Sequence, residues 1–350
     1  MLAKSSQNAH ILTTTVGSYP VPDWLVALPS EQAVIDATRV VIDTQEQAGI
    51  DLVCDGELYR FDVNHPETNG MIEYFVRPMS GVRNEIGLAE WLAFKQSADH
   101  KFRSRPPGVV DGAIGPGTLD LPAAYTRAKK LATRPLKFTL TGPHMLAKML
   151  LDNHYKDKAA LTMAIADVLA EQVKHIDANV IQVDEANLPG SPEEWEWAAE
   201  AMNRVLDAIP TVPAVHLCFG NYGGQTIQKG SWSKLIDYLN KLHVDHIVME
   251  NAHRPPEELA VFRELRPEIG FGLGVVDIKQ TVVESAESIA RAIEHADKVL
   301  GVGRVKYIHP DCGFWMLKRN MADGKIRALG QPWGRAPRLA PAVAHGPARP

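Results

Sequence analysis

Short apolar segments rich in β-branched residues alternate along the chain with longer segments of helical periodicity. A short apolar run fits a strand buried on both faces, whereas apolar residues three and four apart fit a helix. The pattern predicts strands over residues 11–16, 51–55, 136–141, 180–184, 214–218, 246–250, 270–276 and 305–310. The longest predicted helices cover residues 30–49, 158–176, 191–209 and 287–300.

This alternation of strands and helices is typical of a parallel sheet that is covered by helices. Eight strand–helix units predict an α/β fold, a single (β/α)8 TIM barrel. An open doubly wound sheet is the alternative, and it usually has fewer strands and a glycine-rich phosphate loop after the first one. The segment TVGSYPVP after the first strand lacks the G-x-G-x-x-G pattern, which favours the barrel.

Two segments fall outside the pattern. Residues 61–121 are a long insertion after the second strand, rich in Gly, Pro and Arg, and predict a lid or an extended hairpin. Residues 330–350 are rich in Pro, Ala, Gly and Arg without periodicity, and we expect a disordered tail after a barrel domain of residues 1–329. Ser191 and Glu194, three residues apart, predict a capping box at the start of a helix.

The formal net charge of −5, without a long basic block, argues against a nucleic-acid partner. No apolar run approaches the ~18–20 residues that span a bilayer, and the first residues lack the features of a signal peptide. We therefore expect a cytoplasmic protein without a membrane partner. Three cysteines in 350 residues make a poor disulfide framework. A homo-oligomer is compatible with the sequence, which leaves the oligomeric state open.

Polar residues gather where the later predicted strands end, and this is the end of a barrel that carries function. His216 and Cys218 end the fifth strand and, two residues apart, point the same way. Glu250 ends the sixth strand and Cys312 follows the eighth. Each residue alone is common in a core or a salt bridge, but the four together make a first shell for Zn²⁺. Cys54, in the middle of a strand, is interpreted as a core residue.

The motifs HLC, MEN and HPDCG, in this order, resemble the catalytic domain of cobalamin-independent methionine synthase. The resemblance extends from TTTVGSYP near residue 13 to about residue 320. It implies a TIM barrel and zinc held by His216, Cys218, Glu250 and Cys312.

The resemblance also implies homocysteine as the thiol substrate, which is methylated to methionine. The turn Val16-Gly17-Ser18 would meet the substrate carboxylate through backbone N–H groups, and Glu57 and Asp184 would bind its ammonium. Zn²⁺ with two thiolates and one carboxylate carries a formal −1 and is a weak Lewis acid. A substrate thiol bound through sulfur loses its proton and stays nucleophilic, which indicates thiol alkylation rather than hydrolysis.

The chain also departs from the family. It has no room for the additional N-terminal barrel that helps full-length members hold a polyglutamylated folate, so the donor is open between a methyl-folate, methylcobalamin and a corrinoid protein. Lys279 stands where the familiar enzymes have a histidine that is credited with proton transfer to the leaving group. Lys279 and Asp184 are thus the predicted catalytic residues, although a reference pKa of ~10.4 suits an acid poorly and Lys279 also fits an anion-binding role.

Two other functions fit the same zinc barrel. Epoxyalkane:coenzyme M transferases open epoxides with a sulfonate-bearing thiol, for which Lys279 and Arg60 are candidate cations. Glu57 and Asp184 favour an ammonium over a sulfonate, so methyl transfer is preferred. The third function is a barrel that holds zinc without catalysis and acts as a methyl carrier or scaffold partner.

Overall fold

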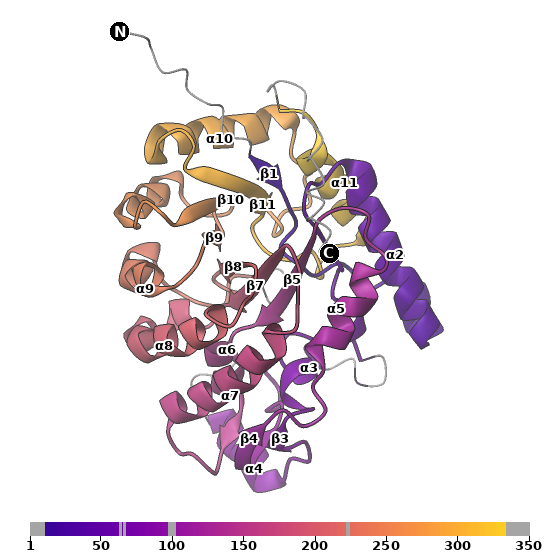
Figure 1. The fold of residues 1–350 in the computed structure, drawn as a ribbon, viewed down its shortest axis with the longest axis vertical. Coiled ribbons are helices and arrows are strands. Elements are labelled where there is room, and N and C mark those ends of the chain that lie inside the picture. The colour runs from indigo at the N-terminus through magenta and orange to yellow at the C-terminus, as the bar shows by residue number, and fades with distance from the viewer. Residues whose placement is uncertain (1–10, 63–64, 66–67, 97–102, 222–224, 334–350) are drawn as a thin grey trace, which may run out of the picture.

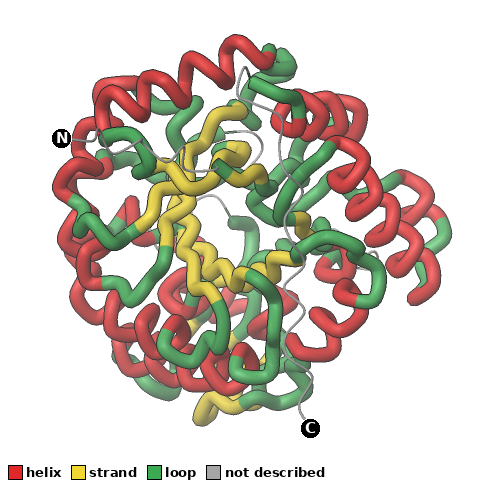
Figure 2. Tube along the Cα trace, turned by 45° about the horizontal axis from the view of Figure 1, so that its top comes forward, coloured by secondary structure: helices red, strands yellow, loops and turns green. Residues whose placement is uncertain are grey.

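The computed structural model describes residues 11–62, 65, 68–96, 103–221 and 225–333. Eight parallel strands form one sheet in the order β1-β11-β10-β9-β8-β7-β5-β2. They are β1 (Leu12–Thr13), β2 (Val53–Cys54), β5 (Leu136–Thr141), β7 (Val180–Glu185), β8 (Val212–Leu217), β9 (His246–Met249), β10 (Gly270–Val276) and β11 (Val305–Pro310). A parallel bridge between Thr14 and Leu52 brings the two edges of this sheet together. The predicted (β/α)8 barrel is confirmed, and its curled sheet is visible in Figure 2.

The strands are apolar because both faces of the sheet are covered. Every residue of β5, β7 and β10 is buried, as expected for parallel strands between a barrel interior and a layer of helices. One large apolar cluster contains most of the buried core, and a second, small one contains residues from five parts of the barrel: Val16, Leu52, Val180, Ala214 and Val248.

Helices surround the sheet (Figure 1). They are α1 (Asp23–Ala27), α2 (Glu31–Ala48), α5 (Leu121–Lys129), α6 (Pro143–Met149), α7 (Lys158–Val173), α8 (Trp195–Leu206), α9 (Ile236–Lys241), α10 (Ala286–Leu300) and α11 (Arg319–Gly330). Short 3-10 turns are η1 (Leu58–Arg60), η3 (Leu188–Gly190), η4 (Pro192–Glu194), η5 (Trp232–Leu235) and η6 (Pro256–Glu264). None of the helices in the described part of the chain is long and apolar enough to cross a membrane.

The prediction of a capping box at Ser191 is wrong. A 3-10 turn over Pro192–Glu194 precedes α8, and the Ser191 side chain caps no helical N–H group. Its hydroxyl instead accepts a hydrogen bond from Lys148, and Glu194 accepts from Lys148 at 2.9 Å and contacts His144 at 2.8 Å. The side chains of Ser191 and Glu194 are therefore engaged by Lys148 and His144 of another helix and do not cap α8.

The predicted insertion contains α3 (Glu73–Val76), β3 (Ser80–Arg83), α4 (Leu88–Gln96) and β4 (Val109–Gly115). The strand β4 pairs antiparallel with β3 and parallel with β6 (Leu151–Asp152), which follows α6. This small sheet lies at one end of the molecule, at the bottom of Figure 1. The insertion is thus a hairpin with its own helices. Of the predicted tail, residues 334–350 lie outside the described residues, whereas Trp333 is buried.

Candidate active site

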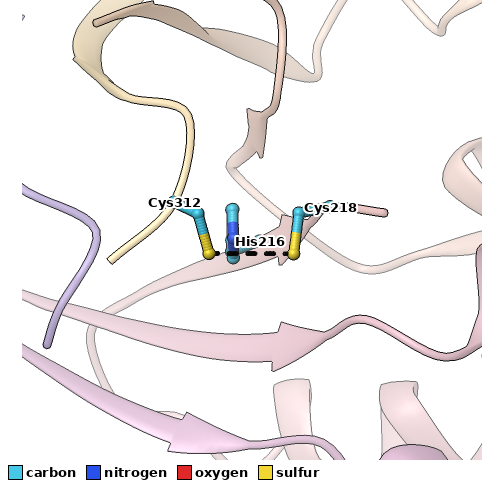
Figure 3. A group of neighbouring side chains, drawn as sticks. All are labelled: His216, Cys218 and Cys312. Atoms are coloured by element: carbon cyan, nitrogen blue, oxygen red, sulfur yellow. Dashed lines mark hydrogen bonds between the residues drawn. The ribbon is translucent and has the colours of Figure 1, made fainter. Parts of the chain in front are cut away.

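Three of the four predicted metal ligands lie together at the mouth of the barrel. His216 is in β8, Cys218 directly follows this strand, and Cys312 follows β11. One ligand atom from each lies within 4.8 Å of the other two. In the view of Figure 3, the side chains of Cys218 and Cys312 lie on either side of His216, and a dashed line joins their sulfur atoms.

The distance of 3.9 Å between the sulfur atoms of Cys218 and Cys312 is informative. A disulfide requires about 2.05 Å. Two thiolates that each lie ~2.3 Å from a tetrahedral zinc ion are roughly 3.8 Å apart. A hydrogen bond from Cys218 holds the pKa of Cys312 well below the usual thiol value, against the effect of burial. The pair is therefore spaced for a shared metal ion, with one sulfur already inclined to be a thiolate.

The His216 ring is oriented as a metal ligand should be. Its Nδ1 lies 2.9 Å from the carbonyl oxygen of Val248, so Nδ1 carries the proton and donates it. Its Nε2 is buried and has no hydrogen-bond partner among the described residues. A buried nitrogen without a partner is unfavourable, and metal-binding histidines typically donate their other N–H group in this way. The donor set therefore fits zinc.

The fourth predicted ligand, Glu250, is not part of the group within 4.8 Å. Its Oε1 accepts a hydrogen bond from Lys279 Nζ at 2.8 Å, and its Oε2 accepts one from the backbone N–H of Phe219 at 3.1 Å. Both side chains of the ion pair are at most 3% exposed. Burial alone would lower the pKa of Lys279, but the charge of Glu250 and the hydrogen bond to it raise this pKa. Proton donation by Lys279 at neutral pH is correspondingly unfavourable.

The predicted substrate residues face the same pocket as the metal cluster. A pocket of about 840 Å³, its open mouth included, is lined by Val16, Ser18, Glu57 and Asp184 together with His216, Cys218 and Cys312. Gly17, Glu250 and Lys279 are not among the lining residues, so the cavity brings together three of the four predicted metal ligands and four of the five predicted substrate residues.

Gly17 is required by the position of Glu57. A Cβ atom at Gly17 would lie 2.2 Å from the Glu57 carboxylate oxygen Oε1. Glu57 itself has a positive φ of 62°, which is unusual for a residue other than glycine and is a mark of functional sites. Its carboxylate accepts a hydrogen bond from the Thr139 hydroxyl and lies 3.3 Å from Arg60 Nη1. Glu57 is thus held tightly against the turn after β1.

Arg60 neutralises Glu57 rather than offering a free cation. Its side chain is 2% exposed, and Nη2 donates to the Thr139 carbonyl and hydroxyl. The guanidinium also lies 5.1–5.7 Å from the ring centroids of Tyr59, Tyr74 and Phe75. Arg60 is not among the residues that line the pocket. A role in binding a substrate sulfonate therefore has no geometric support.

Asp184 is a pocket carboxylate whose pKa is raised. Burial raises the pKa of Asp184 to about 7, and the nearby charge of Glu57 adds to the rise while His216 and Arg60 oppose it. Two buried carboxylates that face one cavity favour a cationic ligand group. An amino-acid ammonium would satisfy this preference.

Sequence reasoning missed the pocket wall that comes from the insertion and from α6. This wall contains Asn69, Met71, Ile72, Arg103, Met145 and Met149. Methionine and isoleucine are ordinary core residues, so nothing in the sequence distinguished these. Arg103 is buried and forms an ion pair with Glu73 in the same insertion. The insertion therefore contributes residues to the wall of the pocket.

Asp311 was also missed, although it stands next to Cys312 in the HPDCG motif. Its carboxylate accepts hydrogen bonds from the backbone N–H groups of Asn251, Ala252 and His253 at 2.7–2.8 Å. A Cβ atom on Gly274 would lie 2.1 Å from it. Asp311 ties the loop that follows Glu250 to the loop that carries Cys312.

Comparison with known proteins finds a matching family and similar relatives. Residues 11–331 match the family described as "Cobalamin-independent synthase, Catalytic domain". The methionine synthase of Thermococcus kodakarensis is 30% identical over 334 residues, which cover 90% of this chain and 90% of that protein. The methionine synthase of Sulfolobus acidocaldarius is also 30% identical, over 90% of this chain and 88% of that protein.

Solved structures share the fold. A B12-independent methionine synthase from Shewanella sp. W3-18-1 in complex with selenomethionine superposes with a TM-score of 0.73 at 24% identity, over 91% of this chain and 95% of that one. A methyltransferase from Methanosarcina mazei gives a TM-score of 0.57 at 11% identity, over 91% and 93% of the two chains. At these identities, the likeness establishes the architecture only.

Proposed function

The chain belongs to the family of cobalamin-independent methionine synthase catalytic domains, and on this premise we propose that it is a zinc-dependent methyltransferase that converts homocysteine into methionine. One observation carries the proposal: a His–Cys–Cys cluster opens onto the same cavity as two buried carboxylates, Glu57 and Asp184. The first group suits a thiol and the second suits an ammonium. Homocysteine carries both.

In this proposal, His216, Cys218 and Cys312 would hold the zinc ion and Glu250 would supply the fourth ligand. Zinc, when bound, lowers the pKa of a substrate thiol so that its sulfur is nucleophilic at neutral pH. The Lys279 ammonium beside Glu250 offsets one negative charge of the ligand set. This contact favours a role for Lys279 in holding Glu250 over a role in proton transfer.

The amino-acid part of the substrate would be bound by the predicted substrate residues. Asp184 and Glu57 would accept hydrogen bonds from its ammonium, and the backbone N–H groups of the turn Val16-Gly17-Ser18 would donate to its carboxylate. The Shewanella protein of the same fold is in complex with selenomethionine, an analogue of the proposed product, which supports an amino acid as the ligand. The reaction forms the bond between sulfur and methyl carbon and releases the thiol proton and the demethylated donor. A methyl-folate, methylcobalamin or a corrinoid protein would supply the methyl group.

The three cysteines of the chain provide a matched test. Cys218→Ser and Cys312→Ser should each reduce bound zinc and abolish homocysteine methylation while the barrel stays folded. Cys54→Ala is the control, because Cys54 is 1% exposed in β2 and is not among the pocket-lining residues. Zinc content, circular dichroism and methionine formation with each of the three donors are measured. Full zinc content and activity in Cys218→Ser would refute the metal assignment.

The epoxide-opening alternative is tested in the same experiment by replacing homocysteine with coenzyme M. Both cations considered for a sulfonate, Lys279 and Arg60, are paired with the carboxylates of Glu250 and Glu57. We therefore expect homocysteine to bind more tightly than coenzyme M. Binding of neither thiol would favour the non-catalytic scaffold.

A further inference from the structure

Hydrogen bonds inside the barrel link the two halves of the proposed amino-acid site. Lys137 Nζ donates to the Thr15 carbonyl at 2.6 Å and to Gln182 Oε1 at 2.7 Å. Gln182 Nε2 in turn donates to the Val16 carbonyl at 2.9 Å and to Asp184 Oδ1 at 2.7 Å. The chain of contacts thus runs from a lysine to the turn after β1 on one side and to Asp184 on the other.

Both central residues are deeply buried, with exposed fractions of 1% for Lys137 and 0% for Gln182. They project from neighbouring strands, since Lys137 in β5 is in register with Val180 in β7, two residues before Gln182. Burying an ammonium group is unfavourable unless its hydrogens find acceptors. An apolar side chain would fill this position at lower cost, so stability alone does not account for a lysine here.

The lysine determines how the glutamine amide is oriented. Both contacts of Lys137 Nζ are with carbonyl oxygens, so Lys137 is the donor in each, whereas an amide offers an accepting oxygen and a donating nitrogen. Burial lowers the pKa of Lys137, but the side chain has the hydrogens for these two bonds whether or not it is charged. Lys137 therefore holds the Gln182 oxygen toward itself, and the amide hydrogens are left to face the Val16 carbonyl and Asp184. Without Lys137, the amide oxygen loses its donor, and the amide is held only by the two hydrogen bonds of its nitrogen to Val16 and Asp184.

The oriented amide in turn fixes groups that face the pocket. One Asp184 oxygen is occupied by Gln182, which holds the plane of the carboxylate. Because peptide units are planar and trans, a Val16 carbonyl that points toward Gln182 makes the Gly17 N–H group point the opposite way. The Asp184 carboxylate, which would accept from the ligand ammonium, and the Gly17 N–H group, which would donate to the ligand carboxylate, are thereby held in place before any ligand binds.

We propose that Lys137 and Gln182 are positioning residues that preorganise the pocket for an α-amino acid. The inference rests on the proposed function, because it deepens the assignment of the same cavity. It gives the buried lysine a role in selecting ligands with an ammonium group, without contact to the ligand. Its loss should therefore affect ligands according to whether they carry that group.

The test uses two thiols that differ only in the amino group, homocysteine and 4-mercaptobutanoate. Their dissociation constants are measured by titration calorimetry on zinc-loaded wild type, Lys137→Met and Gln182→Met. Asn203→Ala is the control, because Asn203 is a buried amide on α8 that bonds Lys241 and His243 and does not line the pocket. Zinc content and thermal unfolding of every variant are recorded beside the affinities.

We expect both variants to bind homocysteine about tenfold or more weakly, to lose less affinity for 4-mercaptobutanoate, which has a carboxylate but no ammonium group for Asp184, and to keep the wild-type zinc content. Asn203→Ala should lose stability and keep both affinities. Equal losses for the two thiols would overturn the inference, as would unchanged homocysteine binding. If Lys137→Met does not fold, Gln182→Met decides. Failure of the proposed function is distinguishable, since the wild-type protein itself would then not bind homocysteine.

Discussion

Replacing Gly17 by alanine tests whether the turn after β1 and Glu57 act as one unit. The added Cβ would lie 2.2 Å from Glu57 Oε1, whereas ordinary contact begins near 3.4 Å, so the two atoms must separate by about 1.2 Å. Glu57 has little room to move, because its carboxylate is bound by the Thr139 hydroxyl and by Arg60. We expect the carboxylate to be displaced and these contacts to be weakened.

The size of the effect follows from what is lost. Hydrogen bonds to charged groups contribute ~1.5–3 kcal/mol, so a displaced Glu57 should weaken binding of the amino acid about ten- to 150-fold. Overpacking should also lower the free energy of unfolding by ~1–3 kcal/mol. Calorimetric titration with L-methionine measures the first effect, and denaturant unfolding measures the second. Zinc content should stay at the wild-type value, because Gly17 is not a predicted ligand.

Two controls make the result specific. Gly112→Ala in β4 should change neither affinity nor stability by much, because the nearest atom to its added Cβ is 3.7 Å away. Glu57→Ala alone and combined with Gly17→Ala completes a double-mutant cycle. If the alanine at residue 17 acts through Glu57, the double variant should bind methionine as weakly as Glu57→Ala does. Wild-type affinity in Gly17→Ala, or additive losses in the cycle, would refute the reasoning.

Two further predictions concern buried carboxyl groups. Since the pKa of Asp184 is raised to about 7, its carboxylate is protonated below that pH. The affinity of the wild-type protein for L-methionine should therefore rise as the pH increases from 6 to 8, and the affinity of Asp184→Asn should not depend on pH. Calorimetric titration across this range measures both, and a wild-type affinity that does not change with pH would contradict the prediction. Asp311→Ala should leave the three N–H groups of residues 251–253 without their acceptor and reduce zinc retention against a chelator; unchanged retention would mean that this link does not position the metal loops.

The central strands were predictable because their sequences carry a strong signal. The bounds of β5, β10 and β11 agree with the predicted ranges, since these runs are apolar and buried on both faces. The strands β1 and β2 are only two residues long. Neither strand includes the turn at Val16 or the residues around Glu57. The two strands are therefore shorter than predicted at the predicted substrate residues, and functional sites are where local sequence patterns most often fail to predict the structure.

The site was predictable where its residues lie at strand ends and unpredictable where they depend on tertiary contacts. His216, Cys218 and Cys312 follow from alternation and from the barrel geometry. The pairing of Lys279 with Glu250 does not, because 29 residues separate them and either could serve a surface salt bridge. Lys137 could not be identified as a site residue from the sequence, because one lysine in a short strand does not change the prediction of that strand.

The charges around the pocket indicate where a ligand's positive charge belongs. Glu250 is paired with Lys279, and Glu57 is paired with Arg60. Asp184 has no salt bridge to a lysine or arginine among the described residues, and Lys137 reaches it only through the Gln182 amide. A buried carboxylate without a direct cationic partner is unfavourable in its charged form, as its raised pKa indicates. An ammonium group would remove this disadvantage, so Asp184 is where a substrate amino group gains most from binding. A thiol without an amino group would leave Asp184 unpaired, which is why affinity should discriminate between such ligands.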